Sequence, residues 1–180
     1  MRFAVLSDTH GDLSRMFAAA DYIRALKPDA LIHLGDFCAD AEAMAKELRL
    51  ELHAVAGNCD AGRTTHPAVD VLEAVGARIL LCHGHTYDVG ETPQRLIWAA
   101  QERECTAALF GHTHRQFLEK EDGVLLMNSA AAGTAPESPA DSAGGSDDEY
   151  GGDIERLFEE IGLDIRDFES LGFKGEDDEA

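Results

Sequence analysis

The chain has 180 residues with a formal net charge of −20, and 44% of the residues are hydrophobic. This length allows one full-sized domain with a short appendage, and the apolar content excludes a wholly disordered chain. No apolar run approaches the roughly 18 residues that a membrane span needs, and the short run after Met1 is interrupted by Asp8. We therefore expect a cytoplasmic protein without a membrane partner.

The negative charge is concentrated near the C-terminus, where residues 137–180 hold 16 acids and 3 bases. Stable binding of nucleic acid depends on neutralising phosphates and is not expected of such a chain. A small phosphate ester is not excluded, because bound metal ions can reverse the local field. The four cysteines form no C-x-x-C pair and are expected to be reduced.

The first third of the chain alternates between strand and helix patterns. Short apolar runs predict strands, and apolar residues at helical spacing predict the helices between them. Residues 37–40 read as a loop before the second helix. The alternation is typical of a βαβαβ unit with parallel strands. The expected strands are residues 3–6, 30–34 and 52–56, and the expected helices are residues 13–26 and 41–48.

The pattern then changes to hairpins. Residues 69–75 and 78–82 read as two strands joined by Gly76-Ala77, and residues 116–119 and 124–127 as a second hairpin around Asp122-Gly123. Between them we expect a helix over 93–104 and a buried strand over 106–110. Mixed parallel and hairpin strands predict an α/β (α+β) fold in which a two-sheet β-sandwich is flanked by helices.

Composition divides the chain into three parts. Residues 1–132 form the predicted domain, and residues 133–152 are rich in Gly, Ser, Pro, Ala and acids, which is typical of a flexible acidic linker. Residues 153–180 have apolar residues at helical spacing and are expected to form an acidic helical appendage.

Five strand-like runs end in side chains that bind metals. In an α/β sheet the carboxyl ends of parallel strands meet at one edge, so these side chains are expected to converge. Histidines used for structure would scatter, as His33, His53 and His66 do, and we interpret His33 as a satisfied core histidine. The residues at the five exits are Asp8 and His10, Asp36, Asn58, His83 and His85, and His112 and His114.

This ligand set has a definite chemistry. Carboxylate and imidazole together suit Mn, Fe, Zn or Ni better than Ca or Mg alone. Two ions about 3.5–4 Å apart need a bridging carboxylate and can hold both oxygens of an in-line displacement at phosphorus. The glycines beside several of these residues allow the backbone to approach such ions closely.

The motifs together resemble the signature of the calcineurin-like metallophosphoesterases, and most closely that of a short bacterial and archaeal phosphodiesterase branch. The resemblance extends over residues 1–128 and implies a four-layer architecture. The motifs are Asp8-x-His10, Gly35-Asp36, Gly57-Asn58-Cys59-Asp60, His83-Gly84-His85 and Gly111-His112-Thr113-His114.

The resemblance also implies roles for these residues. Asp8, His10 and His114 would hold one metal ion; Asn58, His83 and His112 would hold a second; Asp36 would bridge the two. The implied cofactors are two divalent transition-metal ions, with Mn favoured and Ni, Fe or Zn as alternatives. His85 would orient a ligand or contact the substrate, or it would be a polar turn residue, and the catalytic group would comprise Asp36, Asn58 and His85.

Cys59 departs from a common family pattern. Many relatives have a histidine there, which acts as the general acid for the leaving group. A thiol replaces it poorly, so we interpret Cys59 as a packed turn residue. The substitution favours substrates whose leaving groups need little protonation, such as activated diesters.

The function predicted from the sequence is hydrolysis of a small phosphodiester by a dinuclear metal centre with a metal-bridged hydroxide as nucleophile. A phosphomonoesterase and a non-catalytic scaffold of the same fold, like the retromer subunit of this superfamily, are the alternatives. A homo-oligomer and a protein contact through the C-terminal tail, which carries Phe158, Phe168 and Phe173, are the partners left open.

Overall fold

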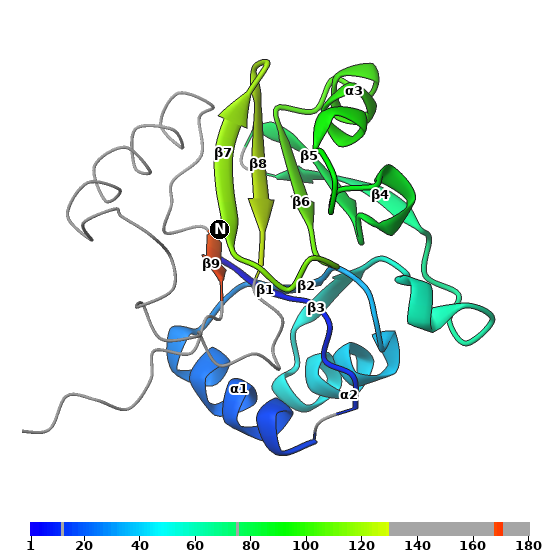
Figure 1. Cartoon of the computed structure of the whole chain (residues 1–180). Coiled ribbons are helices and arrows are strands. Elements are labelled where there is room, and N and C mark those ends of the chain that lie inside the picture. The colour runs from blue at the N-terminus through cyan, green and yellow to red at the C-terminus, as the bar shows by residue number, and fades with distance from the viewer. Residues whose placement is uncertain (12, 75, 130–167, 171–180) are drawn as a thin grey trace, which may run out of the picture.

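The protein forms four layers, with helices outside two packed β-sheets (Figure 1). The structure is a computed structural model and describes residues 1–11, 13–74, 76–129 and 168–170. One sheet has the strand order β3-β2-β1-β9, and the other has the order β4-β5-β6-β8-β7. The predicted two-sheet sandwich flanked by helices is confirmed.

The first sheet is the predicted parallel βαβαβ unit. β1 (Phe3–Leu6), β2 (Ala30–His33) and β3 (Glu51–Ala54) are parallel, and α1 (Leu13–Leu26) and α2 (Cys38–Leu48) connect them. The expectation of a loop over residues 37–40 is wrong in part, because α2 begins at Cys38. The Asp60 carboxylate accepts the Cys38 backbone N–H at 2.9 Å and so supports the start of this helix from a distant position in the chain.

The second sheet contains the predicted hairpins. β4 (Val69–Ala74) pairs antiparallel with β5 (Ala77–Cys82), and β7 (Phe117–Glu121) pairs antiparallel with β8 (Val124–Asn128). β6 (Ala107–Phe110) lies parallel to both β5 and β8. The helix α3 (Gln94–Glu102) packs outside this sheet.

The edge of the first sheet holds a strand that the sequence did not predict. β9 (Phe168–Ser170) pairs in parallel with Phe3–Val5 of β1. These three residues lie in the segment expected to be helical, so that expectation is wrong for them. Helical apolar spacing is weak evidence over three residues when a sheet edge is open to pairing. The predicted boundaries at 132/133 and 152/153, and the linker between them, lie outside the described residues.

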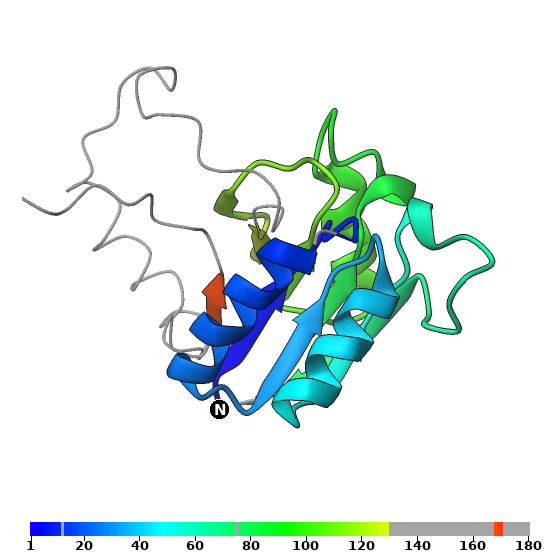
Figure 2. The same cartoon turned by 90° about the horizontal axis from the view of Figure 1, so that it is seen from below.

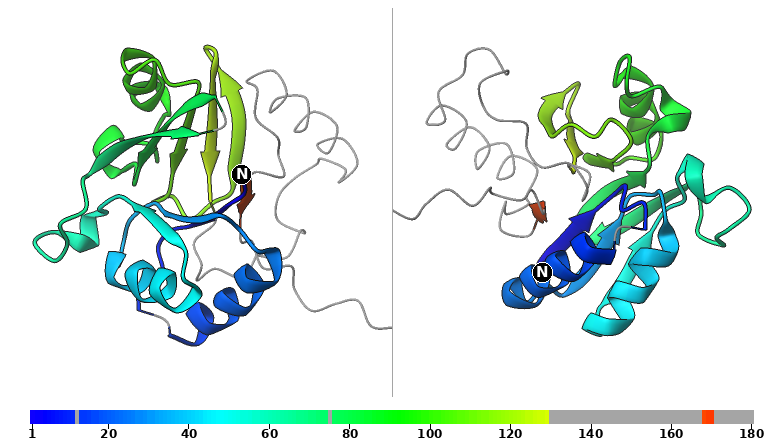
Figure 3. Two further views of the ribbon diagram at one scale, coloured as in Figure 1. Left: turned by 180° about the vertical axis from the view of Figure 1, so that it is seen from behind. Right: turned by 60° about the horizontal axis from the view of Figure 1, so that its bottom comes forward.

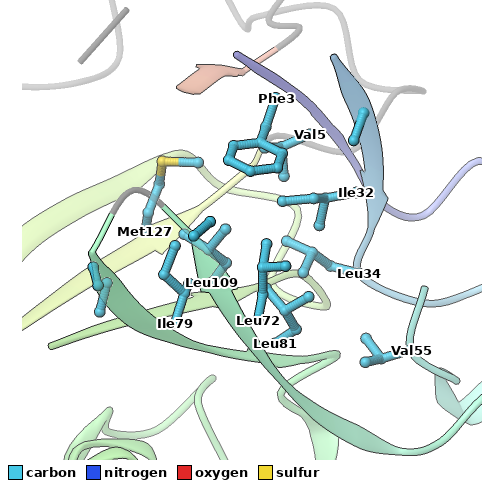
Figure 4. Close-up of a cluster of buried hydrophobic side chains, with 14 of the residues drawn as sticks. Phe3, Val5, Ile32, Leu34, Val55, Leu72, Ile79, Leu81, Leu109 and Met127 are labelled. Atoms are coloured by element: carbon cyan, nitrogen blue, oxygen red, sulfur yellow. The ribbon is translucent and has the colours of Figure 1, made fainter. Parts of the chain in front are cut away.

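The two sheets pack face to face on an apolar core. Phe3, Val5 and Ile32 of the first sheet point toward Ile79 and Leu109 of the second, and all five side chains are buried (Figure 4). The intervening residues of the same strands face the outer helices, so these strands are buried on both faces. This double burial explains why their sequences read as continuous apolar runs and not as alternating ones.

Helices cover both outer faces. α1 and α2 lie side by side over β1, β2 and β3, where Leu31 and Ile23 are fully buried (Figure 2). α3 covers the opposite face of the molecule, where its Leu96 and Ile97 are fully buried against the second sheet (Figure 3). Among the described residues no helix is long and apolar enough to cross a membrane.

Candidate metal centre

The strand exits singled out from the sequence lie together where the two sheets meet. Within the first sheet, the Asp8 N–H donates to the Gly35 carbonyl at 3.0 Å, and within the second the Gly111 N–H donates to the His83 carbonyl at 3.1 Å. Between the sheets, the His112 N–H donates to Asp8 Oδ2 at 3.2 Å. Hydrogen bonds thus join the exits of β1, β2, β5 and β6, two between backbone groups and one from a backbone N–H to the Asp8 carboxylate.

Sharp backbone turns present the side chains at these exits. Asp8, His10, Asp36, His112 and His114 all have left-handed backbone conformations, with φ between 49° and 70°. This region is unfavourable for most residues but is visited more often by Asp and His, and strained residues cluster at functional sites. The strain is maintained by the surrounding hydrogen bonds and aims the five side chains into a shared space.

Two glycines leave the room that this arrangement needs. A Cβ at Gly57 would lie 2.1 Å from Asp36 Oδ1 and 2.4 Å from the Asp36 nitrogen. A Cβ at Gly35, where φ is +96°, would lie 2.7 Å from His83 Nδ1. Both positions require glycine because a carboxylate or an imidazole occupies the place of a side chain.

The first group of converging side chains comprises Asp8, His10 and His114. One potential ligand atom from each lies within 4.8 Å of those of the other two. The His10 and His114 rings are stacked, with centroids 5.7 Å apart, and His114 Nε2 lies 3.4 Å from Asp8 Oδ1. These three residues are the ones assigned to the first metal by resemblance.

The second group surrounds His83. Its Nε2 lies 3.2 Å from Asn58 Oδ1 and 3.5 Å from Asp36 Oδ1, and its ring centroid is 5.0 Å from that of His112. His83 Nδ1 lies 2.7 Å from the Leu34 carbonyl, which can only accept, so Nδ1 carries the proton. In the neutral ring the lone pair of Nε2 then faces the site, which is the tautomer that a metal ligand needs.

Asp36 lies between the two groups. Its carboxylate belongs to one set with Asp8 and His83 and to another with His10 and Cys59, in each of which the potential ligand atoms lie within 4.8 Å of one another. Its Oδ1 also accepts the Cys59 backbone N–H at 2.8 Å. This is the position that a bridging carboxylate would occupy.

Cys59 is closer to the centre than the interpretation as a packed turn residue suggested. It is half-buried, and its sulfur is grouped with His10 and Asp36. A side-chain hydrogen bond to Asp36, together with burial, raises the pKa of the Cys59 thiol above its usual value. The thiol is therefore held in its protonated form beside the carboxylate.

His85 lies at the rim of the second group. Its ring centroid is 5.3 Å from that of His83 and 6.1 Å from that of His112. Burial lowers the pKa of His85, and the neighbouring imidazoles of His83 and His112 lower it further. Its buried Nδ1 has no hydrogen-bond partner among the described residues. The lowered pKa favours the neutral ring of His85 at the rim of the second group.

Asp60, in the short helix η1 (Asn58–Asp60), holds the loops of the centre in place and was not singled out from the sequence. Its carboxylate accepts backbone N–H groups of Asp36, Cys38 and Gly57, each at 2.9 Å. Burial opposes ionisation of Asp60, but these donors outweigh burial and lower its pKa. Its place in the Gly57-Asn58-Cys59-Asp60 motif was the available signal.

Two further polar residues that sequence reasoning missed support the exits. Asp40 Oδ2 accepts the Thr9 hydroxyl and the Gly11 N–H, both at 2.8 Å, and so fixes the loop that carries His10. Asn128 Nδ2 donates to the Gly111 carbonyl at 3.1 Å and to Thr113 Oγ1 at 2.6 Å, on either side of His112. No local sequence pattern predicts either contact.

His33 is a correction to the sequence analysis. It is fully buried on β2, as expected, but neither ring nitrogen has a hydrogen-bond partner among the described residues, so it is not satisfied. Burial lowers its pKa to about 4 against the opposing pull of Asp60, Asp8 and Asp40. His33 is therefore a neutral imidazole beneath the site.

The donor set fits divalent metal ions. Asp8 and Asp36 are 1% and 3% exposed, and buried carboxylates are costly unless a cation or several donors compensate them. Asp8 Oδ1 is buried without a hydrogen-bond partner among the described residues, although three imidazoles and a second carboxylate surround it. Carboxylate oxygens and imidazole nitrogens that converge in this way form the kind of ligand set that a divalent transition-metal ion prefers.

The chain belongs to the calcineurin-like phosphoesterase superfamily, whose family model matches residues 1–143. Members of this family use divalent metal ions, in agreement with the chemistry of the donor set. A probable metallophosphoesterase of Mycoplasma pneumoniae is 30% identical over 127 residues, covering 69% of this chain and 74% of the relative. The probable metallophosphoesterase YsnB of Bacillus subtilis is 30% identical over 129 residues, covering 71% and 73%. These similarities support a phosphoesterase.

Solved structures share the fold. A conserved protein of Streptococcus pneumoniae TIGR4, described as a predicted phosphoesterase, matches with a TM-score of 0.58 and 29% identity over 72% of this chain and 71% of that one. Vps29 of Entamoeba histolytica, solved in complex with Zn²⁺, matches with a TM-score of 0.64 and 21% identity over 77% and 78%. An archaeal phosphodiesterase matches with a TM-score of 0.60 and 22% identity over 73% and 84%.

Proposed function

We propose that this protein is a phosphodiesterase that uses two divalent metal ions to hydrolyse a small phosphodiester. The observation that carries the proposal is the convergence of His10, His114, Asp36 and His83 on Asp8, whose buried Oδ1 has no hydrogen-bond partner among the described residues. Asp8, His10 and His114 would hold one ion; Asn58, His83 and His112 would hold the other; Asp36 would contact both. Mn is the ion we favour for this mixture of carboxylate, amide and imidazole ligands.

Bound together, two such ions would supply Lewis acidity at the phosphoryl oxygens and lower the pKa of an attacking water. The chain's own residues do the positioning. The hydrogen bond from His83 Nδ1 to the Leu34 carbonyl and that from the Cys59 N–H to Asp36 Oδ1 orient the His83 ring and the Asp36 carboxylate, the side chains that would bind the ions. The His85 ring, 5.3 Å from that of His83 and 6.1 Å from that of His112, would contact a phosphoryl oxygen at the rim of the centre.

The similarity to an archaeal phosphodiesterase favours a diester over a monoester, and what the site lacks for the leaving group favours an activated ester. Cys59 stands where many relatives have a histidine, and its protonated thiol is a weak proton donor. Hydrolysis should therefore be fastest when the leaving oxygen needs little protonation. This reasoning selects activated diesters as the first substrates to test.

The test is the hydrolysis of bis(p-nitrophenyl) phosphate and of p-nitrophenyl phosphate, with and without added Mn²⁺. We expect Mn-dependent cleavage of the diester, faster than of the monoester, and a loss of at least about 100-fold in kcat for Asp36→Asn. Asp70→Asn, on an exposed position of β4, is the matched control and should keep the wild-type rate. Metal content should approach two ions per chain.

Three outcomes contradict the proposal. Equal rates for wild type and Asp36→Asn would show that the candidate metal centre takes no part in the hydrolysis. Faster monoester cleavage would favour a phosphomonoesterase. Metal content well below two ions per chain, together with no hydrolysis, would favour the non-catalytic scaffold.

A further inference from the structure

A cavity of about 510 Å³ adjoins the candidate metal centre at His112. Its walls come from the loop between η2 (His85–Tyr87) and α3 and from the loop between β6 and β7. The volume lies within the 300–1,000 Å³ typical of small-molecule sites and far exceeds what a phosphoryl group fills. The cavity therefore has room for an organic group attached to the phosphorus.

One part of the cavity lining is apolar and aromatic. Phe117 and Pro93 are partly exposed there, and the buried Phe110 and Val89 lie with them, the ring centroids of Phe110 and Phe117 being 6.1 Å apart. Aromatic rings and apolar side chains of this kind bind flat aromatic groups by stacking and by burial of apolar surface. A charged or strongly hydrated group would gain little there.

The cavity lining includes one permanently charged basic side chain, that of Arg115. Apart from His112, Arg115 is the only basic residue among those that line it, and it is exposed. A guanidinium beside the centre suits an anionic phosphoryl oxygen. The cavity thus combines an aromatic site, a cation and a candidate metal ligand, which is the arrangement that an aromatic phosphate ester requires.

Both walls are built in advance of any ligand. The Asp88 carbonyl accepts the N–H groups of Glu91 and Thr92 at 2.9 and 3.2 Å, and the Asp88 carboxylate pairs with Arg95 of α3. On the other wall, Thr113 Oγ1 accepts a hydrogen bond from Asn128. A preformed cavity loses little conformational entropy on binding and can therefore discriminate between ligands.

We propose that this cavity binds a flat aromatic group of the phosphodiester, with nucleoside esters and simple aryl esters as the two sources of that chemistry. The proposal rests on the proposed function, because it assigns the neighbouring phosphoryl group to the metal centre. The group that occupies the cavity is the ester substituent retained on phosphorus, so that the cavity sets which diesters are cleaved.

Gly90 offers a way to fill the cavity without disturbing the centre. It lines the cavity, and a Cβ added there would meet no atom within 4 Å. Gly90→Phe should therefore block the cavity, and Gly90→Ala should change it little. Neither variant alters a candidate metal ligand.

The first measurement compares three p-nitrophenyl esters with the same leaving group, formed on thymidine 5′-phosphate, phenyl phosphate and methyl phosphate. For Mn-loaded wild type we expect kcat/KM for the thymidine ester, the phenyl ester or both to exceed that for the methyl ester at least tenfold. In Gly90→Phe this preference should disappear while the methyl ester keeps its rate within about twofold. A wild-type preference near one, or a preference that survives in Gly90→Phe, would overturn the proposal.

The second measurement needs no catalysis. Calorimetric titration of Mn-loaded protein with thymidine 5′-monophosphate and with inorganic phosphate should show tighter binding of the nucleotide by wild type and equal binding of the two by Gly90→Phe. Arg115→Gln should weaken nucleotide binding, whereas Arg24→Ala, on the exposed face of α1, should not. If no ester is cleaved but this pattern appears, the cavity assignment stands and the proposed function fails; if wild type does not distinguish nucleotide from phosphate, the assignment fails.

Discussion

His33 shows how a single residue can make the stability of this protein depend on pH. Its imidazole is fully buried, its ring nitrogens have no hydrogen-bond partners among the described residues, and Asp60, Asp8, Asp40 and His83 are the titratable groups around it. The folded-state pKa is about 4, against 6.5 for the exposed side chain. Well above pH 6.5 the ring is neutral in both the folded and the unfolded protein, so its protonation does not change the free energy of unfolding.

As the pH falls from 6.5 through 4, the unfolded chain binds a proton that the folded chain does not. Stability is therefore lost over this window, by about 2 kcal/mol between pH 7.5 and pH 5. We expect His33→Leu and His33→Gln to reduce the difference in free energy of unfolding between these pH values by that amount. Urea denaturation at both pH values measures it, and an unchanged difference in both variants would contradict the assignment.

At the scale of elements, the candidate metal centre depends more on the loops that follow the strands than on the strands themselves. The carboxyl-terminal ends of β1, β2 and β6 bring their candidate ligands together because backbone turns with positive φ follow these strands. Glycines leave space beside the side chains. Gly57 is the most demanding position, since its missing side chain is replaced by the Asp36 carboxylate. A change there moves the exit of β2 although it lies after β3.

Gly57→Ala should therefore lower metal affinity at least about tenfold, because Asp36 must shift to admit the new methyl group. Calorimetric titration with Mn²⁺ measures the effect. Gly123→Ala, in the turn between β7 and β8 where φ is +83° and a Cβ meets no atom, is the control. It should cost about 1 kcal/mol of stability from backbone strain and leave metal affinity intact. Wild-type affinity in Gly57→Ala would show that Asp36 does not need its present position.

Elements whose pattern is local could be predicted from the sequence. The apolar runs of β1, β2 and β6 and the hairpin of β4 and β5 are recognisable because burial or a turn marks each of them. The start of α2 and the pairing of β9 could not be predicted, because each depends on residues far away in the chain, Asp60 for the first and the edge of β1 for the second.

The same division holds for the candidate site. Side chains that face the centre, such as Asp8 and His83, could be found from strand exits, and their assignment as metal ligands stays a prediction. Among the residues that position them, Asp60 was marked only by its place in the Gly57-Asn58-Cys59-Asp60 motif. Asp40 and Asn128 contact backbone groups of other loops, which no spacing pattern predicts. His33 was recognised as a core residue, but its lack of partners depends on packing that no sequence pattern reveals.

At the scale of the whole molecule, negative charge acts against folding, and residues 1–136 alone hold 19 acids against 12 bases. Like charges repel one another more strongly in the compact state than in the extended chain, and salt screens this repulsion over about 10 Å at 0.1 M. The described surface ion pairs, such as Arg78 with Glu73, are exposed and offset little of it.

We therefore expect the melting temperature to rise between 20 and 500 mM NaCl by at least about 2–4 °C, which corresponds to roughly 1 kcal/mol in a domain of this size. Circular dichroism at constant pH measures the transition. Choline chloride at equal ionic strength should give the same rise if screening is the cause. A flat or falling melting temperature would show that charge repulsion does not limit stability.

The hydrogen bonds that join the exit of β1 to the exits of β6 and β8 have a consequence for synthesis of the protein in the cell. Ser7 and Ser129, joined by a hydrogen bond between their hydroxyls, are 122 residues apart, and Asp8 and the His112 amide are 104 residues apart. A ribosome must therefore translate nearly the whole domain before the halves of the centre can meet. A product of premature termination that lacks the β6 exit would carry Asp8 and His10 without His114. It could therefore not complete the first group of candidate ligands.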